Sequence, residues 1–289
     1  MKINGINAID VVVNIWTDES LTFRPGWRDG FFLDKMKANP DNVKGISLDR
    51  MLAKMDEAGI ERSFLIQIKA GRLGHPSTYH LPLKLVADAV QKHPDRFYGL
   101  AGVDPYQGMK GVRELEIAVK EYGFVGAHLY PHWFELAPDH AKYYPFYAKC
   151  CELDVPMLLH IGQSMIYAPD YPCRSVGTPI SLDAVACDLP ELKLVASHIG
   201  IPWTQEMIAM AWKHPNIYIA SDAHSPKYWP ENFVHYINTY GQDKVLFATD
   251  FPVLDFERTM NEIRDLKLRD TVLPKFLRDN AVRVYKLKV

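Results

Sequence analysis

Four histidines stand at the ends of consecutive apolar segments, and they are the first sign of chemistry in this sequence. His128, His160 and His198 each end such a segment, His224 closely follows the next, and Asp250 ends the last. Imidazole and carboxylate groups suit a hydrolytic site, as zinc ligands or as general bases near neutral pH. A catalytic zinc takes about three protein ligands and a water. His160, His198 or His224, and Asp250 meet that count.

The segments that must position these residues alternate with amphipathic helical patterns along the whole chain. Eight nearly continuous apolar runs are typical of parallel strands buried on both faces. The predicted strands are Asn7–Asn14, Ser63–Ile68, Phe97–Asp104, Phe124–Tyr130, Pro156–Ile161, Leu192–His198, Asn216–Asp222 and Lys244–Asp250. Helical patterns include 47–60, 109–123 and 143–153, with Ser47 and Asp49 as candidate caps and Gly59 and Gly123 at helix ends.

Eight such units predict an α/β fold, a (β/α)8 TIM barrel, over residues 1–289 as one domain. An open, doubly wound sheet fits less well, because the chain lacks the glycine-rich phosphate motifs typical of that class. Two long segments, 16–46 and 163–180, follow the first and fifth strands. Active sites of barrels lie at this end of the strands, so we expect both segments to act as lids.

Composition narrows the class of protein. The 289 residues are 48% hydrophobic, and 33 Lys+Arg oppose 35 Asp+Glu, so the charge does not indicate a nucleic-acid partner. No apolar run reaches the roughly 18 residues of a membrane span, and the first residues do not resemble a signal peptide. Cys150, Cys151, Cys173 and Cys187 form no zinc or disulfide pattern. We therefore expect a cytoplasmic protein.

Three segments resemble the late strands of the amidohydrolase-2 family, which includes aminocarboxymuconate-semialdehyde decarboxylase. They are LLHIG (158–162), LVASHIGIPW (194–203) and KVLFATDFPV (244–253). The resemblance implies metal ligands from a strand-one Asp-x-His-x-His motif, a strand-five histidine and a strand-eight aspartate, with a strand-six histidine that orients or activates water. His160, His198 and Asp250 match the last three positions. Relatives of this kind are often dimers, so a homodimer is an expectation from the resemblance.

The first strand departs from the family pattern. Val12 and Asn14 stand where the two histidines are expected, and Asp10 matches the aspartate but is expected to be structural. Three outcomes follow: a catalytically dead relative, a divalent metal, expected to be zinc, on a shifted set that draws on His128 or His224, or a metal-free site. In the metal-free site, His160, His198 and Asp250 would be the acid–base groups.

Cations and aromatic residues near the strand ends indicate the substrate. Lys69, Arg72, Arg174, Arg28 and His75 are candidates to hold a carboxylate or phosphate. Aromatic residues would suit a flat ring. They are the block 127–134, which contains His128 and Tyr130, together with Trp16, Phe23, Trp27, Tyr167, Tyr171 and Trp203. The predicted substrate-binding residues are Asn14, Lys69, Arg72, His128, Tyr130 and Trp203, and the predicted partner is a small acidic or aromatic molecule.

The leading hypothesis is a hydrolase that directs water at a carbonyl carbon of a small acidic, aromatic-derived compound. Cleavage of a C–C bond in a β-keto compound is one version of it. The alternative is non-oxidative decarboxylation of an aromatic or muconate-type acid by the same groups. A third hypothesis, from a different class, is a binding protein without catalysis.

Overall fold

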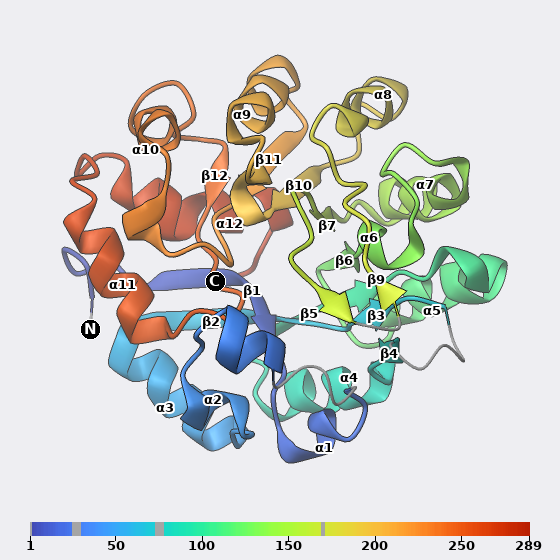
Figure 1. The fold of residues 1–289 in the computed structure, drawn as a ribbon, viewed down its shortest axis with the longest axis horizontal. Helices are drawn as coiled ribbons and strands as arrows, with labels where there is room; N and C mark the ends of the chain where they lie inside the picture. The colour runs from blue at the N-terminus through green and yellow to red at the C-terminus, as the bar shows by residue number, and fades with distance from the viewer. Residues whose placement is uncertain (1, 25–29, 73–77, 169–170) are drawn as a thin grey trace.

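Eight parallel strands form a closed barrel in the computed structural model, which describes residues 2–24, 30–72, 78–168 and 171–289. The strands follow each other around the barrel in chain order (Figure 1). They are β1 (Ala8–Asn14), β2 (Ile60–Ile66), β5 (Phe97–Gly102), β6 (Gly126–Leu129), β7 (Met157–His160), β10 (Leu194–Ser197), β11 (Ile217–Ala220) and β12 (Val245–Leu246). The prediction of a TIM barrel is confirmed.

The barrel closes between its first and last strands. The amide of Val11 donates to the carbonyl of Phe247 (3.1 Å), the amide of Asp250 to Val12 (2.9 Å), and the amide of Asn14 to Phe251 (2.9 Å). The expected strand Lys244–Asp250 is regular only over Val245–Leu246, because from Phe247 onward the backbone bonds elsewhere: the Phe247 amide donates to the Phe276 carbonyl, and the Phe247 carbonyl accepts from Val11. This join brings the ends of β1 and β12 to one point of the mouth.

A ring of helices covers the strands on the outside (Figure 1). It consists of α3 (Leu48–Ala58), α4 (Leu83–Lys92), α5 (Gly108–Lys120), α7 (Tyr144–Leu153), α8 (Ser181–Asp188), α9 (Thr204–Lys213), α10 (Glu231–Asn238), α11 (Phe256–Asp265) and α12 (Asn280–Tyr285). In α3, the Ser47 side chain accepts from the Arg50 amide, and Gly59 ends the helix at φ 80°. Both predicted signals are confirmed, and Met51 and Met55 are buried toward the barrel.

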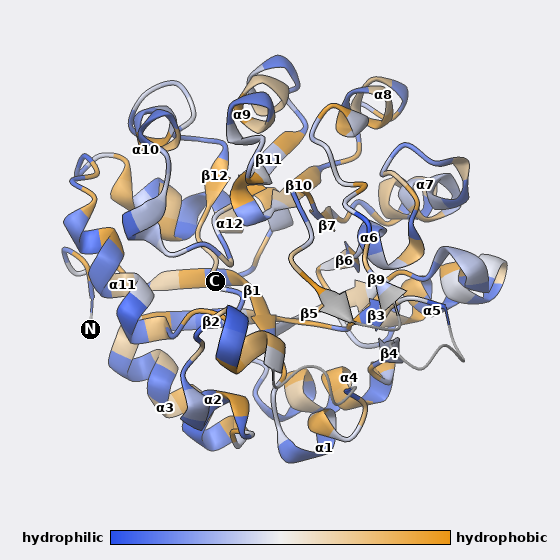
Figure 2. Ribbon diagram, viewed as in Figure 1, coloured by the Kyte–Doolittle hydropathy of each residue, from blue (hydrophilic) through white to orange (hydrophobic). Residues whose placement is uncertain are grey.

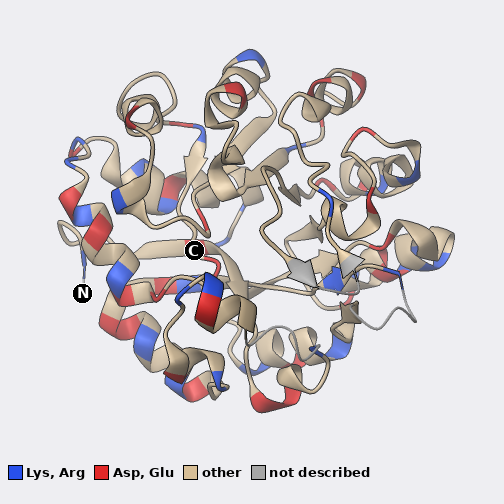
Figure 3. Cartoon of the chain, viewed as in Figure 1, with Lys and Arg blue, Asp and Glu red and all other residues tan. Residues whose placement is uncertain are grey.

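Apolar and charged residues separate as this architecture requires. The strands are mostly hydrophobic and the outer faces of the helices hydrophilic (Figure 2). Lys, Arg, Asp and Glu gather on the helical ring and are sparse on the strands (Figure 3). Within the described ranges, no helix has both the length and the apolar character needed to cross a membrane.

The two long segments expected as lids lie over the mouth of the barrel. The first contains α1 (Asp18–Leu21), a π-helical turn (Gly30–Lys35) and α2 (Pro40–Val43). The second contains the short strands β8 (Tyr167–Ala168) and β9 (Tyr171–Pro172). Lys35 Nζ donates to the Met165 carbonyl at 2.5 Å, so the two segments touch. Shorter additions are β3 (Lys69–Ala70) with β4 (Tyr79–His80), and α6 (Pro131–Phe134) after β6.

Candidate active site

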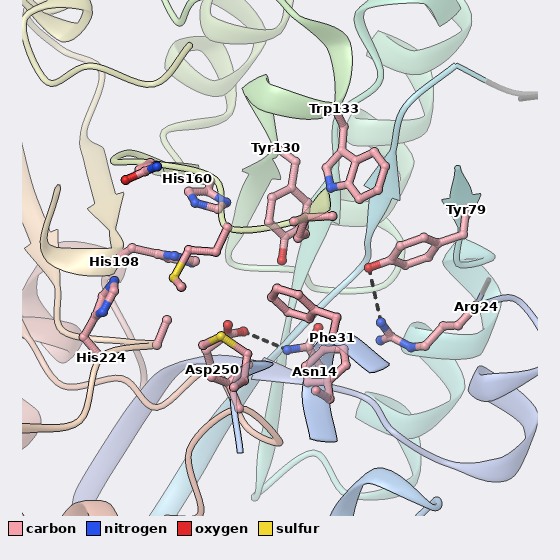
Figure 4. A pocket seen from close by; sticks show the side chains of 17 residues that line it. Asn14, Arg24, Phe31, Tyr79, Tyr130, Trp133, His160, His198, His224 and Asp250 are labelled. Atoms are coloured by element: carbon pink, nitrogen blue, oxygen red, sulfur yellow. Dashed lines mark hydrogen bonds between the residues drawn. The ribbon is translucent and has the colours of Figure 1, made fainter. Parts of the chain in front are cut away.

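A cavity of about 70 Å³ opens at the carboxyl ends of the strands, where the barrel fold places active sites. Its polar end contains His160, His198, His224, Asp250 and Asn14 (Figure 4). Aromatic rings form much of the rest, and both long segments contribute to the wall. The other lining residues are Arg24, Phe31, Phe32, Met36, Tyr79, Tyr130, Trp133, Gln163, Met165, Ile166, Ala223 and Val253.

Three residues that line this cavity have left-handed backbones although none is glycine. They are His198 (φ 67°), Ala223 (φ 66°) and Asp250 (φ 59°). Such a conformation costs about 1–3 kcal/mol and persists where surrounding contacts enforce it, often at functional sites. Here the backbone amide of Asp250 donates a hydrogen bond to the Val12 carbonyl. The backbone amide of His198 donates one to Asp222 Oδ1 at 3.0 Å. The fold thus maintains strain at the strand ends that form the site.

Asp250 is held in place from β1. Asn14 Nδ2 donates to Asp250 Oδ1 at 2.8 Å and to the Phe251 carbonyl at 3.0 Å. Because the same nitrogen has two acceptors, Asn14 presents its N–H groups, and not its oxygen, to Asp250. Asn14 therefore acts on Asp250 as a hydrogen-bond donor.

Asp10, in β1, stabilises the contact between the first and last strands of the barrel. Asp10 is fully buried and accepts from the amides of Val12 and Thr249 through Oδ1, both at 3.1 Å. Its Oδ2 accepts from the Thr249 hydroxyl at 2.6 Å. With three bonds inside the barrel wall, Asp10 has the structural position expected for it.

The histidines form a contiguous group. The rings of His160 and His198 stack with centroids 3.8 Å apart, and His132 meets His160 edge-on at 4.5 Å. Burial holds the pKa values of His160 and His198 well below the usual range and lowers that of His224 to about 4. These imidazoles are neutral near pH 7.

Two buried carboxyl groups lie beside this group. Asp222 Oδ2 is 3.2 Å from His198 Nε2 yet accepts no well-aligned hydrogen bond among the described atoms. Burial raises the pKa of Asp222 to about 8. Burial, and then repulsion from Asp222, raises the pKa of Asp250 well above its usual range. Two buried acids this close favour either a bound proton or a bound cation.

The donor atoms fit a divalent metal. One donor atom each from His198, Asp222 and Asp250 can be chosen so that all three lie within 4.8 Å of one another. Asp222 Oδ2 and His160 Nε2 are buried and have no hydrogen-bond partner among the described atoms. Imidazole and carboxylate together suit manganese or zinc. This set shares His198 and Asp250 with the predicted one and adds Asp222, whereas His160 and His224 lie outside the group.

Comparison with known protein families identifies the family of this chain. A model of the amidohydrolase family matches residues 9–287. The chain belongs to the amidohydrolase family. Its relatives within this family include a gamma-resorcylate decarboxylase of Polaromonas sp., which is 26% identical over 288 residues, covering 83% of this chain and 87% of that protein.

Solved structures of amidohydrolase-like proteins have the same fold. An uncharacterized TIM-barrel protein of Bordetella bronchiseptica has a TM-score of 0.80 and 22% identity, over 97% of this chain and 99% of that one. A dihydroxybenzoic acid decarboxylase from Polaromonas sp., solved with manganese and the inhibitor 2-nitroresorcinol, has a TM-score of 0.73 and 23% identity, over 97% of each chain. The metal in that relative is manganese, whereas zinc was the expectation here.

The structure gathers some of the predicted residues and separates others. His160, His198, His224, Asp250, Asn14 and Tyr130 all line the cavity. His128 lies behind the lining with its ring 4.4 Å from Tyr130, and burial lowers its pKa to about 3. Trp203 is half-buried at the start of α9, outside the lining.

The expected cations that the structure describes, Lys69, Arg72 and Arg174, do not line the cavity. Lys69 is buried and turns outward, where Nζ meets Glu114 at 2.9 Å and Gln107 at 3.0 Å. Arg72 is exposed and stacks on Tyr106, and the exposed Arg174 pairs with Glu135 at 3.3 Å. Arg28 and His75 lie outside the described residues. The expectation that Lys69, Arg72 and Arg174 form a cationic mouth is therefore corrected.

The aromatic residues that line the cavity also differ from the predicted ones. Trp16 is buried beneath the first long segment, where its Nε1 donates to Val43, and Phe23 is outside the lining. Trp27 and the side chains of Tyr167 and Tyr171 are not described. Arg24, Tyr79 and Phe31 were missed, because they lie in a loop, a two-residue strand and a π-helical turn that have no periodic sequence signal. Asp222 was visible as a strand end but was not assigned a role.

Proposed function

We propose that this protein is a decarboxylase that removes CO₂ from a small aromatic acid without oxidation. The observation that carries the proposal is the buried Asp250 carboxyl, held by Asn14 at 2.8 Å and open to a cavity with aromatic walls. The decarboxylase activities of the named relatives support this alternative better than hydrolysis. The proposal therefore reverses the order of the two hypotheses drawn from the sequence.

The cavity would hold the ring of the substrate between apolar surfaces. Phe31, Tyr130 and Trp133 supply flat faces, and such walls bind aromatic rings by burying area and by edge or face contacts. Both long segments contribute to the cavity wall and would limit the entry of water, which would strengthen the polar contacts at the reacting end. These residues bind and orient the ring.

Asp250 is the residue to which we assign the proton transfer. Its O–H proton passes to the ring carbon that bears the carboxylate, the bond from that carbon to the carboxyl carbon breaks, and its electron pair returns to the ring. CO₂ leaves, and the Asp250 carboxylate regains a proton from solvent. Asn14 would keep the carboxyl aimed at the substrate through the step.

A metal would complete this site. His198 and Asp222 would hold a divalent ion beside Asp250, and this ion would act as a Lewis acid that polarises an oxygen of the substrate. His160, stacked on His198, would fix the orientation of that ring.

The test is an assay of hydroxybenzoic acids in heavy-isotope water. Decarboxylation predicts release of CO₂ and, in ²H₂O, deuterium on the carbon that lost the carboxylate. In ¹⁸O water, a hydrolase places label in its organic product, whereas a decarboxylase does not. Asp250→Asn should lower turnover by at least roughly 100-fold, while Asp139→Asn, at an exposed aspartate outside the cavity, serves as the matched control. Label from ¹⁸O water in the product, or full activity of Asp250→Asn, would contradict the proposal.

A further inference from the structure

His132 contacts the candidate active site from outside the cavity. It belongs to the short helix α6, is 1% exposed, and its ring meets His160, which lines the cavity. Its Nε2 is buried and has no hydrogen-bond partner among the described atoms. An unpaired buried polar atom costs stability that an apolar side chain at this place would not cost. The imidazole therefore needs a reason to be there.

The other ring nitrogen of His132 holds the base of the second long segment. The backbone amide of Val176 donates to His132 Nδ1 at 3.0 Å. An amide nitrogen only donates, and burial lowers the pKa of His132 to about 4, so the neutral ring carries its proton on Nε2. The Arg174 carbonyl, 3.2 Å from the same Nδ1, would pair with the opposite tautomer. The contact with Val176 thus links the tautomer of His132 to the position of the segment.

The backbone of the segment passes against the His132 ring without room for a side chain. A Cβ atom at Gly177 would lie 2.8 Å from His132 Cε1 and 3.0 Å from the His160 carbonyl. The Gly177 carbonyl accepts from the Gly162 amide at 2.7 Å, which pairs the segment with the residues directly after β7. Gly177 is therefore confined between the ring and the strand end, and a displacement of this base would change its contact with His132.

The edge of the His132 ring fixes His160. The two ring planes meet at 86° with centroids 4.5 Å apart, and His160 in turn stacks on His198 at 3.8 Å. Edge-to-face contacts of this kind favour a defined angle between two rings. Since His160 Nε2 has no hydrogen-bond partner among the described atoms, ring packing holds this side of the imidazole. His132 therefore limits the rotation of His160 and, through it, the position of His198.

We propose that His132 is a positioning residue, which holds the base of the second long segment through Nδ1 and fixes the His160–His198 ring stack through its edge. The proposal rests on the proposed decarboxylase function, in which His198 lies beside the reacting end of the substrate. The same segment contributes three residues to the cavity wall: Gln163, Met165 and Ile166. His132 thus connects the wall that binds the substrate ring with the histidines at the reacting end.

Two substitutions remove the two contacts separately. His132→Asn keeps an oxygen near the position of Nδ1, which can accept from Val176, but removes the ring edge that meets His160. For a hydroxybenzoic acid that the wild type turns over, kcat should fall roughly tenfold and KM should stay within a few-fold. His132→Phe keeps the ring edge but removes the acceptor, so KM should rise roughly tenfold while kcat stays within a few-fold.

Two further measurements do not depend on turnover. Imidazole ¹⁵N shifts of the wild type should show the His132 proton on Nε2, and the His160 signals should shift more in His132→Asn than in His132→Phe. Hydrogen exchange at the Val176 amide should be roughly tenfold faster in His132→Phe than in the wild type and His132→Asn. A role confined to overall stability would not produce this division between the two variants.

His93→Asn is the matched control. His93 directly follows α4 and precedes β5, so it lies at the end of the barrel opposite the mouth. Like His132, it has a buried Nε2 without a hydrogen-bond partner among the described atoms, and its ring meets Phe97 edge-on at 6.0 Å. In this variant kcat, KM and exchange at the Val176 amide should equal those of the wild type. Losses that match those of the His132 variants would overturn the proposal.

Other results would also overturn it. They are a proton on Nδ1 of His132 in the wild type, and wild-type kcat and KM in both His132 variants. If the wild type decarboxylates no hydroxybenzoic acid, the proposed function fails by itself, and the ¹⁵N shifts and the Val176 exchange still decide whether His132 holds the segment and His160. The tautomer is measured on the wild type, so it decides the matter even if neither variant folds.

Discussion

Replacing Asp10 by asparagine should change how the stability of the protein depends on pH. Asp10 is fully buried, and burial raises its pKa to about 7 in spite of hydrogen bonds from Thr249 and the Val12 amide that act in the opposite direction. An asparagine oxygen can accept from the same two amides, and its nitrogen can donate to the Thr249 hydroxyl oxygen. The substitution therefore removes the titration while keeping the shape of the site.

The sign follows from the raised pKa. The folded protein binds this proton more tightly than the unfolded chain, whose aspartate has the ordinary value of 3.8. The resulting stabilisation is complete below pH 3.8 and is lost as the pH rises through about 7. At about 1.4 kcal/mol for each pH unit, the difference corresponds to about 4 kcal/mol in all, of which about 2–3 kcal/mol is lost between pH 5 and 8.

The assay is urea unfolding of the wild type and Asp10→Asn at pH 5, 6, 7 and 8. The unfolding free energy of the wild type, minus that of the variant, should fall by about 2–3 kcal/mol from pH 5 to pH 8. Asp139→Asn, at an exposed aspartate, should show no such trend. Asp222 and Asp250 titrate in both proteins, so most of their contribution cancels in the difference. A difference that stays constant across this range would refute the assigned burial and protonation of Asp10.

Three other substitutions test separate parts of the structure. Lys69→Met should lower the unfolding free energy by about 2–4 kcal/mol, because it breaks a largely buried ion pair. KM should stay within a few-fold of the wild-type value, because Lys69 faces away from the cavity. A large rise in KM would contradict that orientation. Ala223→Gly should raise the unfolding free energy by up to about 1 kcal/mol, since glycine adopts φ 66° without strain. Ala220→Gly, in the regular strand β11, should lower the unfolding free energy. Thermal unfolding of the two variants and the wild type checks both expectations. Asn14→Leu should reduce kcat roughly 10- to 100-fold through loss of the 2.8 Å bond to Asp250, and unchanged steady-state kinetics would remove Asn14 from the site.

The barrel could be predicted because its signals are local. Each strand is a short apolar run, and each intervening helix has its own pattern and end signals, as Ser47 and Gly59 show for α3. The predicted ends of the strands were less accurate where contacts with distant segments determine where a strand ends. The last strand was expected to reach Asp250, but its regular part stops at Leu246, since the chain beyond it turns to join β1.

Local sequence signals predicted only part of the site. His160, His198 and Asp250 follow directly from strand ends, because a parallel barrel brings those ends to one mouth. Lys69 occupies an equivalent position in sequence, yet its flexible side chain turns outward to Glu114, a contact with a helix more than forty residues away. Arg24 and Tyr79 meet across a sequence separation of 55 residues, and no pattern within either segment specifies that encounter.

The join between β1 and β12 has a consequence for synthesis of the chain. Asn14 and Asp250 are separated by 236 positions in sequence, and Asp10 and Thr249 by 239. A ribosome therefore completes nearly the whole polypeptide before the acid and the residues that hold it can meet. Nascent chains and early-terminated fragments would contain the ring-binding walls but lack the proton donor. Two fragments cut in the turn between α7 and β7 should regain turnover only when they reassemble, so activity would report barrel closure directly.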